Sequence, residues 1–148
     1  MQFAILAYDP RNHLPTERSE RAGHELVETL RQTPGAIWIP YHGYLATQAG
    51  KSPQAHWMAV SDVLISTRAG EVRIALQREV EDAILQQKYD LIVLSSRPFP
   101  DFPPITESYA EKGPALTDRR ALWPLTGMPR RPEILYTPRT SGTDAVSP

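Results

Sequence analysis

The sequence predicts an α/β fold, a small three-layer domain of the Rossmann-like type with three parallel strands in its core sheet. Three short apolar runs lack the alternation of a half-exposed strand and so predict strands covered on both faces, at residues 3–8, 36–39 and 91–94. Helical periodicity lies between these runs. Right-handed crossovers with one helix on each face favour the strand order 2-1-3, which makes residues 3–8 the central strand.

Two long helices are predicted from apolar residues spaced by three or four. The segment 16–32 carries Ala22, Leu26 and Leu30 on one face, with charged residues mostly elsewhere, and Thr33-Pro34-Gly35 ends it. The segment 71–87 repeats the pattern, with apolar residues Val72, Leu76, Val80, Ala83 and Ile84. Strand, helix and strand over residues 3–39 have the length of a right-handed βαβ unit.

A connection of roughly thirty residues separates the second strand from the second long helix, far more than the usual 2–6 residues of such a loop. It contains the apolar residues Trp57, Met58, Val60, Val63 and Leu64, which predict a packed short helix. We expect Pro40, Tyr41, His42 and Tyr44 to pack over the carboxyl edge of the sheet. Trp57 and Met58 would be the apolar anchors, since a fully buried large side chain contributes roughly 1.5–3 kcal/mol.

Proline is unusually frequent, with 15 in 148 residues, and it is crowded between residues 98 and 138. Because proline interrupts helices and central strands, this region predicts a proline-punctuated loop packed on the domain. Residues 133–136 are the one further strand expected there, at a sheet edge. The predicted organisation is a single α/β domain over 1–139 and a disordered tail over 140–148.

Composition excludes several classes of partner and site. The 16 basic and 17 acidic residues leave a formal charge of -1, so no nucleic-acid partner is predicted. Without cysteine there is no disulfide or thiolate site, and the four histidines lack metal-ligand spacing, so no metal site is predicted. No apolar run is long enough to span a membrane or serve as a signal peptide, and the chain is expected to be soluble.

Two partial motifs do not predict a cofactor. Gly50-Lys51-Ser52 looks like the end of a phosphate-binding loop, but the required glycine five positions earlier is Leu45. Lys51 is therefore expected to be a solvated loop cation. The first strand is followed by DPRNHLP, without the glycines that let a backbone approach a dinucleotide, so no cofactor is predicted.

Polar residues follow each predicted strand, where open α/β sheets bind ligands. The predicted ligand-binding residues are Asp9, His42, Tyr44, Ser95, Ser96 and Arg97, and the catalytic candidates are His42, Asp9 and Asp62. No G-x-S-x-G elbow exposes a serine, which weighs against a Ser-His-Asp hydrolase. In the structural alternative, His42 and Tyr44 only satisfy backbone groups and fix the long loop. A carboxylate neighbour, Asp9 or Asp62, is expected to raise the pKa of His42.

Four segments give the chain a resemblance to a known class of protein: LAYDPRNHLPT, WIPYHGYLATQAGKSPQAHWMAVSDVL, YDLIVLSS and WPLTGMPRRPEILYTPR. Together they resemble the soluble C-terminal domain that follows the membrane helices in bacterial polytopic glycosyltransferase-like proteins, the dolichyl-phosphate-mannose-protein mannosyltransferase-like proteins. The resemblance spans most of residues 2–139. It implies a location on the extracytoplasmic face of the membrane and an upstream transmembrane region as partner.

The resemblance also implies that glycosyl transfer belongs to the membrane part, so no catalytic residue of the family is carried onto this chain. The leading hypothesis is a noncatalytic accessory domain that binds an acceptor, a partner or a small polar ligand at the carboxyl edge of the sheet. The alternative hypothesis is a small independent α/β enzyme, hydrolase-like, that acts on a polar metabolite with His42 as general base.

Overall fold

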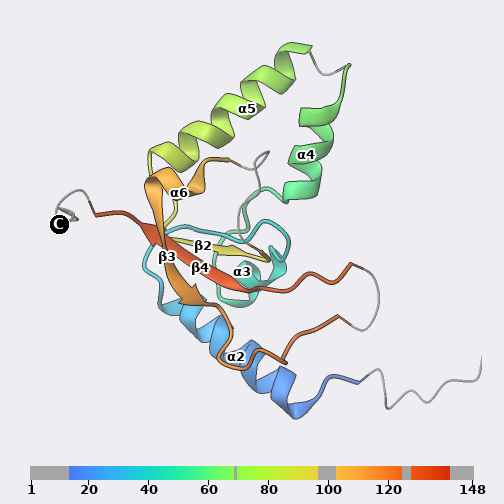
Figure 1. The fold of residues 1–148 in the computed structure, drawn as a ribbon, viewed down its shortest axis with the longest axis vertical. Coiled ribbons are helices and arrows are strands. Elements are labelled where there is room, and N and C mark those ends of the chain that lie inside the picture. The colour runs from blue at the N-terminus through green and yellow to red at the C-terminus, as the bar shows by residue number, and fades with distance from the viewer. Residues whose placement is uncertain (1–13, 69, 97–102, 125–127, 141–148) are drawn as a thin grey trace, which may run out of the picture.

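A computed structural model describes residues 14–68, 70–96, 103–124 and 128–140, in which helices cover both faces of a four-stranded sheet (Figure 1). Element labels follow Figure 1. In chain order the elements are α2 (Glu17–Gln32), β1 (Ile37–Trp38), α3 (Tyr44–Gln48), α4 (Trp57–Ile65), α5 (Gly70–Leu85), β2 (Leu91–Leu94), α6 (Ile105–Ser108), β3 (Tyr109–Pro114) and β4 (Ile134–Pro138).

The sheet is mixed, with strand order β1-β2-β4-β3. β1 and β2 are parallel, with Ile37 opposite Leu91, whereas β4 runs antiparallel to both β2 and β3. The predicted sheet of three parallel strands in the order 2-1-3 is therefore wrong. Because β1 pairs directly with β2, no third strand lies between them. Residues 3–8, the predicted central strand, are outside the described residues.

β2 is the centre of the core because all four of its residues are buried. Leu91 and Val93 face one side of the sheet and pack with α2 and α3, while Ile92 and Leu94 face the other side and pack with α4, α5 and α6. Trp38 of β1 joins the second side. An apolar run without alternation is what a strand covered on both faces requires, and the prediction of strands at β1 and β2 is confirmed.

The predicted helices are confirmed, with small shifts at their ends. Thr16 caps α2 by accepting a hydrogen bond from the Ser19 backbone N–H at 3.2 Å, and Ala22, Leu26 and Leu30 are buried as their spacing predicts. α5 matches the second predicted helix, and α4 is the short helix expected in the long connection.

The proline-rich region contains more regular structure than predicted. Residues 109–114 form β3, an edge strand that includes Glu111, Lys112 and Pro114, and a bulge lies between Glu111 and Gly113. β4 was expected at an edge but lies between β2 and β3, with Tyr136 2% exposed. The loop prediction was wrong because pairing to an apolar neighbour, which is a long-range contact, overrides the weak strand propensity of YAEKGP.

Lys51 is not a solvated loop cation. Its ammonium donates hydrogen bonds to the backbone carbonyls of Thr33, Pro34 and Gly35, where α2 ends and the chain turns into β1. A cation at the C-terminus of a helix satisfies carbonyls that have no partner within the helix. The lysine therefore fixes the turn between α2 and β1.

Candidate functional site

The parallel pair β1 and β2 brings two polar chain exits to one edge of the sheet. After β1 the chain continues through the buried Pro40 to His42, whose backbone N–H donates to the Ile39 carbonyl at 3.2 Å. After β2 comes Ser95, which is 9% exposed. The His42 Nε2 and Ser95 Oγ atoms lie 3.3 Å apart, within hydrogen-bond distance. Residues 53 positions apart in the sequence thus form a contact at the carboxyl edge.

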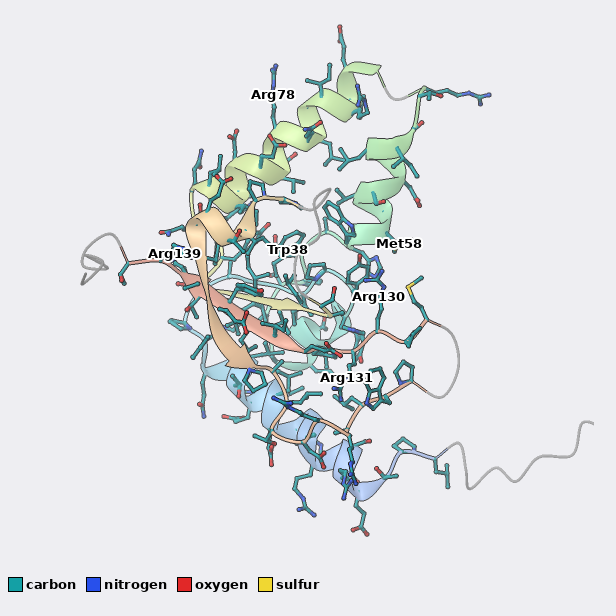
Figure 2. All side chains as sticks on the ribbon, in the orientation of Figure 1. Trp38, Met58, Arg78, Arg130, Arg131 and Arg139 are labelled. Atoms are coloured by element: carbon teal, nitrogen blue, oxygen red, sulfur yellow. The ribbon has the colours of Figure 1, made fainter. Side chains whose placement is uncertain are left out.

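The long connection is held over this edge by two tryptophans. The Trp57 backbone N–H donates to the Pro40 carbonyl at 2.8 Å, and the Trp38 indole N–H donates to the Ala55 carbonyl at 3.0 Å. The two indole rings meet edge to face with centroids 6.4 Å apart. Trp57 is 5% exposed, which confirms it as an anchor, but Met58 is 44% exposed and is not one (Figure 2). Successive residues of a helix point in different directions, so Trp57 points into the core and its neighbour Met58 does not.

Arginine and histidine side chains surround the Tyr41 ring. The Arg130 guanidinium carbon lies 4.2 Å from the ring centroid, and the His56 ring meets Tyr41 edge to face at 6.0 Å. Arg130 comes from the segment that leads into β4 (Figure 2). Because β4 is antiparallel to β2, with Ile134 opposite Leu94, the residues before β4 lie at the edge where β2 ends.

We call this group the edge cluster. It consists of Tyr41, His42, Tyr44, His56, Ser95 and Arg130. It holds one fixed cation, two imidazoles, two phenol rings and one hydroxyl. In the described part of the chain, no carboxylate forms an ion pair with Arg130 or a hydrogen bond with either imidazole. The chemistry of the cluster is therefore that of hydrogen-bond donors and positive charge.

The electrostatic environment of His42 is opposite to the predicted one. Burial lowers the pKa of His42 below its ordinary value of 6.5, and electrostatic interactions with His56 and Arg130 lower it further. The expected carboxylate neighbour would have raised the pKa. His42 is therefore mainly neutral at pH 7, able to accept a proton or to hydrogen-bond through both ring nitrogens.

The other predicted site residues are dispersed. Tyr44 meets the His42 ring edge to face at 6.2 Å, but it is 60% exposed and is not packed down over the sheet as predicted. Ser96 is exposed at the end of β2. Asp62 is exposed on α4, and no interaction in the described structure joins it to His42. Asp9 and Arg97 lie outside the described residues.

Sequence reasoning did not identify Arg130 or His56 as members of the site. The signal for Arg130 was present in MPRRPEILY, where two arginines precede an apolar strand with only Pro132 and Glu133 between. It carried meaning only once that strand was known to run antiparallel beside β2. His56 was hidden by its position in a loop, although it caps α4 by accepting from the Met58 backbone N–H through Nδ1 at 3.2 Å.

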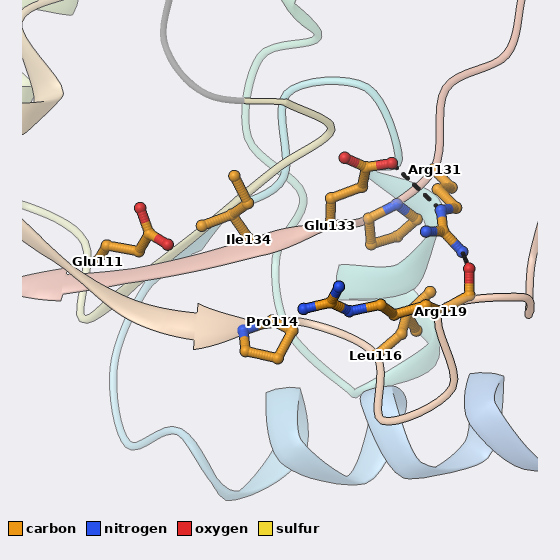
Figure 3. Close-up of a pocket in the computed structure, with 8 residues that line it drawn as sticks. Glu111, Pro114, Leu116, Arg119, Arg131, Glu133 and Ile134 are labelled. Carbon is orange, nitrogen blue, oxygen red and sulfur yellow. Dashed lines mark hydrogen bonds and ion pairs between the residues drawn. The ribbon is translucent and has the colours of Figure 1, made fainter.

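A concave surface lies on the other side of the β4 entry, where β3 and β4 meet the loop between them (Figure 3). It has a volume of about 320 Å³, and Arg131 is one of its lining residues. The Arg131 guanidinium donates to the Arg119 and Ala121 carbonyls at 2.6 and 2.8 Å, and to Glu133 at 3.2 Å. Because these donors of Arg131 bind groups of the protein itself, Arg131 has a structural role in this hollow.

Two features are absent from the described residues. No three residues of the types His, Cys, Asp and Glu are grouped there in a way that could hold a metal ion. None of the helices in the described part has the length and apolar character needed to cross a membrane. Comparison with known proteins found no matching family, no similar curated protein and no similar solved structure.

Proposed function

We propose that this chain is a noncatalytic accessory domain of a membrane glycosyltransferase-like protein and that it binds a small polar ligand at the edge cluster. The observation that carries the binding proposal is the convergence of His42, Ser95 and Arg130 at the carboxyl edge of the parallel pair β1 and β2. Open α/β sheets use this edge for ligands. The link to a membrane protein has its support in the resemblance of the four sequence segments.

The noncatalytic part of the proposal is supported by the state of Ser95. A serine nucleophile needs an exposed hydroxyl and a base that a third group orients. Ser95 is 9% exposed, and in the described residues no carboxylate orients the His42 imidazole. Binding needs neither condition, because partly buried donors are well suited to hold a polar ligand.

The binding proposal is tested by titrating the ¹⁵N-labelled chain with glucose, glucose 1-phosphate and inorganic phosphate, with amide chemical shifts as readout. We expect at least one probe to shift amides of residues 41–45, 56–58 and 95–96. The His42→Ala variant should lose these shifts, and Arg78→Ala, changed on the exposed surface of α5, should keep them. Shifts confined to other surfaces, or no shifts with any probe, would contradict the proposed site.

The proposed link to a membrane protein is tested separately, by the DNA sequence upstream of this chain and by fractionation of the cells. We expect transmembrane helices to be encoded in frame directly upstream of this chain, and an antibody against the chain to detect a longer protein in membranes. A free protein of 16.6 kDa in the soluble fraction would contradict the accessory-domain assignment.

A hydrolase-like enzyme is the second candidate, favoured by one specific observation. The Nε2 to Oγ distance of 3.3 Å and the lowered pKa of His42 give Ser95 a neutral base as neighbour. Turnover of p-nitrophenyl acetate or p-nitrophenyl glycosides tests it. Under the leading proposal no turnover above buffer is expected, whereas turnover that disappears in both His42→Ala and Ser95→Ala would establish the enzyme.

A further inference from the structure

The edge cluster has an excess of positive charge and donors that the described protein does not use. Arg130 carries a permanent positive charge. The burial of His42 and its closeness to Arg130 lower the pKa of His42 and favour its neutral form. Within the described ranges, the ion pairs involve Arg18, Arg31 and Arg131 but not Arg130. A half-buried guanidinium without a carboxylate partner is a binding group for an anion.

The orientation of Arg130 is fixed while its outer donors stay available. The guanidinium stacks at 4.2 Å from the Tyr41 ring centroid, and its Nε donates to the Met128 sulfur at 2.7 Å. Among the described residues, neither of its Nη atoms has a hydrogen-bond acceptor. Stacking holds a guanidinium plane in place and leaves its edge free for two parallel hydrogen bonds to an oxyanion.

His56 adds a second donor whose tautomer the fold determines. Its Nδ1 accepts the Met58 backbone N–H, so the proton of the neutral ring is on Nε2. The His56 ring contacts Tyr41, the ring on which the Arg130 guanidinium stacks. A histidine N-cap is an uncommon choice among residues that cap helices, and here it leaves one N–H for another acceptor.

We propose that the ligand of the edge cluster carries a phosphate group, bound by Arg130 and His56 beside the His42–Ser95 pair. This inference rests on the proposed binding function and assigns its ligand class. A phosphate offers at least three oxygens and a charge near -2, so it can accept two hydrogen bonds from the guanidinium edge and one from the imidazole N–H on separate oxygens. A soluble sugar phosphate and a lipid headgroup present the same chemistry.

The test compares matched charged and neutral probes by the same amide titration. Glucose 1-phosphate and inorganic phosphate are expected to shift amides at 41–45 and 56–58, and glucose to bind at least about tenfold more weakly. Vesicles of phosphatidylcholine with and without phosphatidic acid separate the sources: sedimentation with acidic vesicles, competed by free phosphate, identifies a lipid headgroup. Binding of glucose 1-phosphate without sedimentation identifies a soluble ligand.

Three variants make the inference falsifiable without loss of the fold. Arg130→Gln should weaken phosphate binding at least about tenfold, and His56→Asn, which retains a good helix cap but loses the imidazole N–H, by a few fold. Arg78→Gln is the matched control on α5 (Figure 2) and should stay within about twofold. Equal binding of glucose and glucose 1-phosphate, or full binding by Arg130→Gln, overturns the phosphate inference. Glucose binding at the cluster would still support the proposed function, so the two failures are distinguishable.

Discussion

Replacing Arg131 by methionine should cost about 3 kcal/mol of unfolding free energy, although its neighbour in the sequence is Arg130, for which we propose a binding role. Arg131 is 8% exposed and donates to the Ala121 carbonyl in the buried interior and to the half-buried Arg119 carbonyl. A buried acceptor left without a donor costs about 1–3 kcal/mol. The lost stacking on Trp123, at 4.2 Å, adds about 0.5–1 kcal/mol because Trp123 is half-exposed. Methionine keeps the apolar stem, so packing contributes little to the difference.

Urea unfolding followed by circular dichroism and tryptophan fluorescence measures this loss. The matched control is Arg130→Met. It removes a half-exposed stacking contact with Tyr41, so its loss of unfolding free energy should be no more than about 1 kcal/mol. Arg131→Lys should fall between, because one ammonium cannot reproduce the guanidinium fork. A loss below about 1 kcal/mol for Arg131→Met would refute the view that this arginine fixes the loop between β3 and β4.

Three other predictions concern stability. Tyr109→Phe should cost about 1–2 kcal/mol in urea unfolding, because the Tyr109 hydroxyl, on a fully buried side chain, accepts the Tyr89 backbone N–H at 3.1 Å. Lys51→Met should lower the melting temperature, with a loss of about 1 kcal/mol, since carbonyls at the end of α2 lose their cation. Because the pKa of His42 is lower in the folded chain, the unfolded chain binds a proton at this residue at higher pH than the folded chain does. The contribution of neutral His42 to the unfolding free energy is therefore complete above pH 6.5 and is lost as pH falls toward the folded pKa. Unfolding free energy measured from pH 8 to pH 5 should therefore fall less in His42→Gln than in wild type, whereas His24→Gln, at an exposed position on α2, should follow wild type.

The helices and the two buried strands could be predicted because their signals are local. In α2 the spacing of Ala22, Leu26 and Leu30, with Thr16 as cap, specifies both the helix and its buried face. In β2 four consecutive apolar residues specify a strand covered on both sides. Neither inference needed knowledge of a distant segment.

The sheet order and β3 could not be predicted because they depend on pairing between distant residues. The segment YAEKGP reads as a loop by propensity, and it becomes a strand only beside β4, with Tyr109 opposite Pro138 and Glu111 opposite Tyr136. The predicted order 2-1-3 assumed that every buried apolar run pairs in parallel through crossovers. The antiparallel pair of β3 and β4, connected by residues 115–133, instead extends the sheet on the other side of β2.

The direction of β4 also explains how Arg130 reaches the site. The sequence predicted that Asp9 follows a central strand at residues 3–8 and reaches the carboxyl edge, and these residues lie outside the described part of the chain. The neighbour observed beside β2 is β4, whose antiparallel direction contributes the residues before it, and these include Arg130. A carboxylate beside His42 would raise its pKa and favour cations or proton transfer, whereas a guanidinium lowers the pKa and favours anions. The antiparallel direction of β4 therefore places a guanidinium, Arg130, at the same edge as His42.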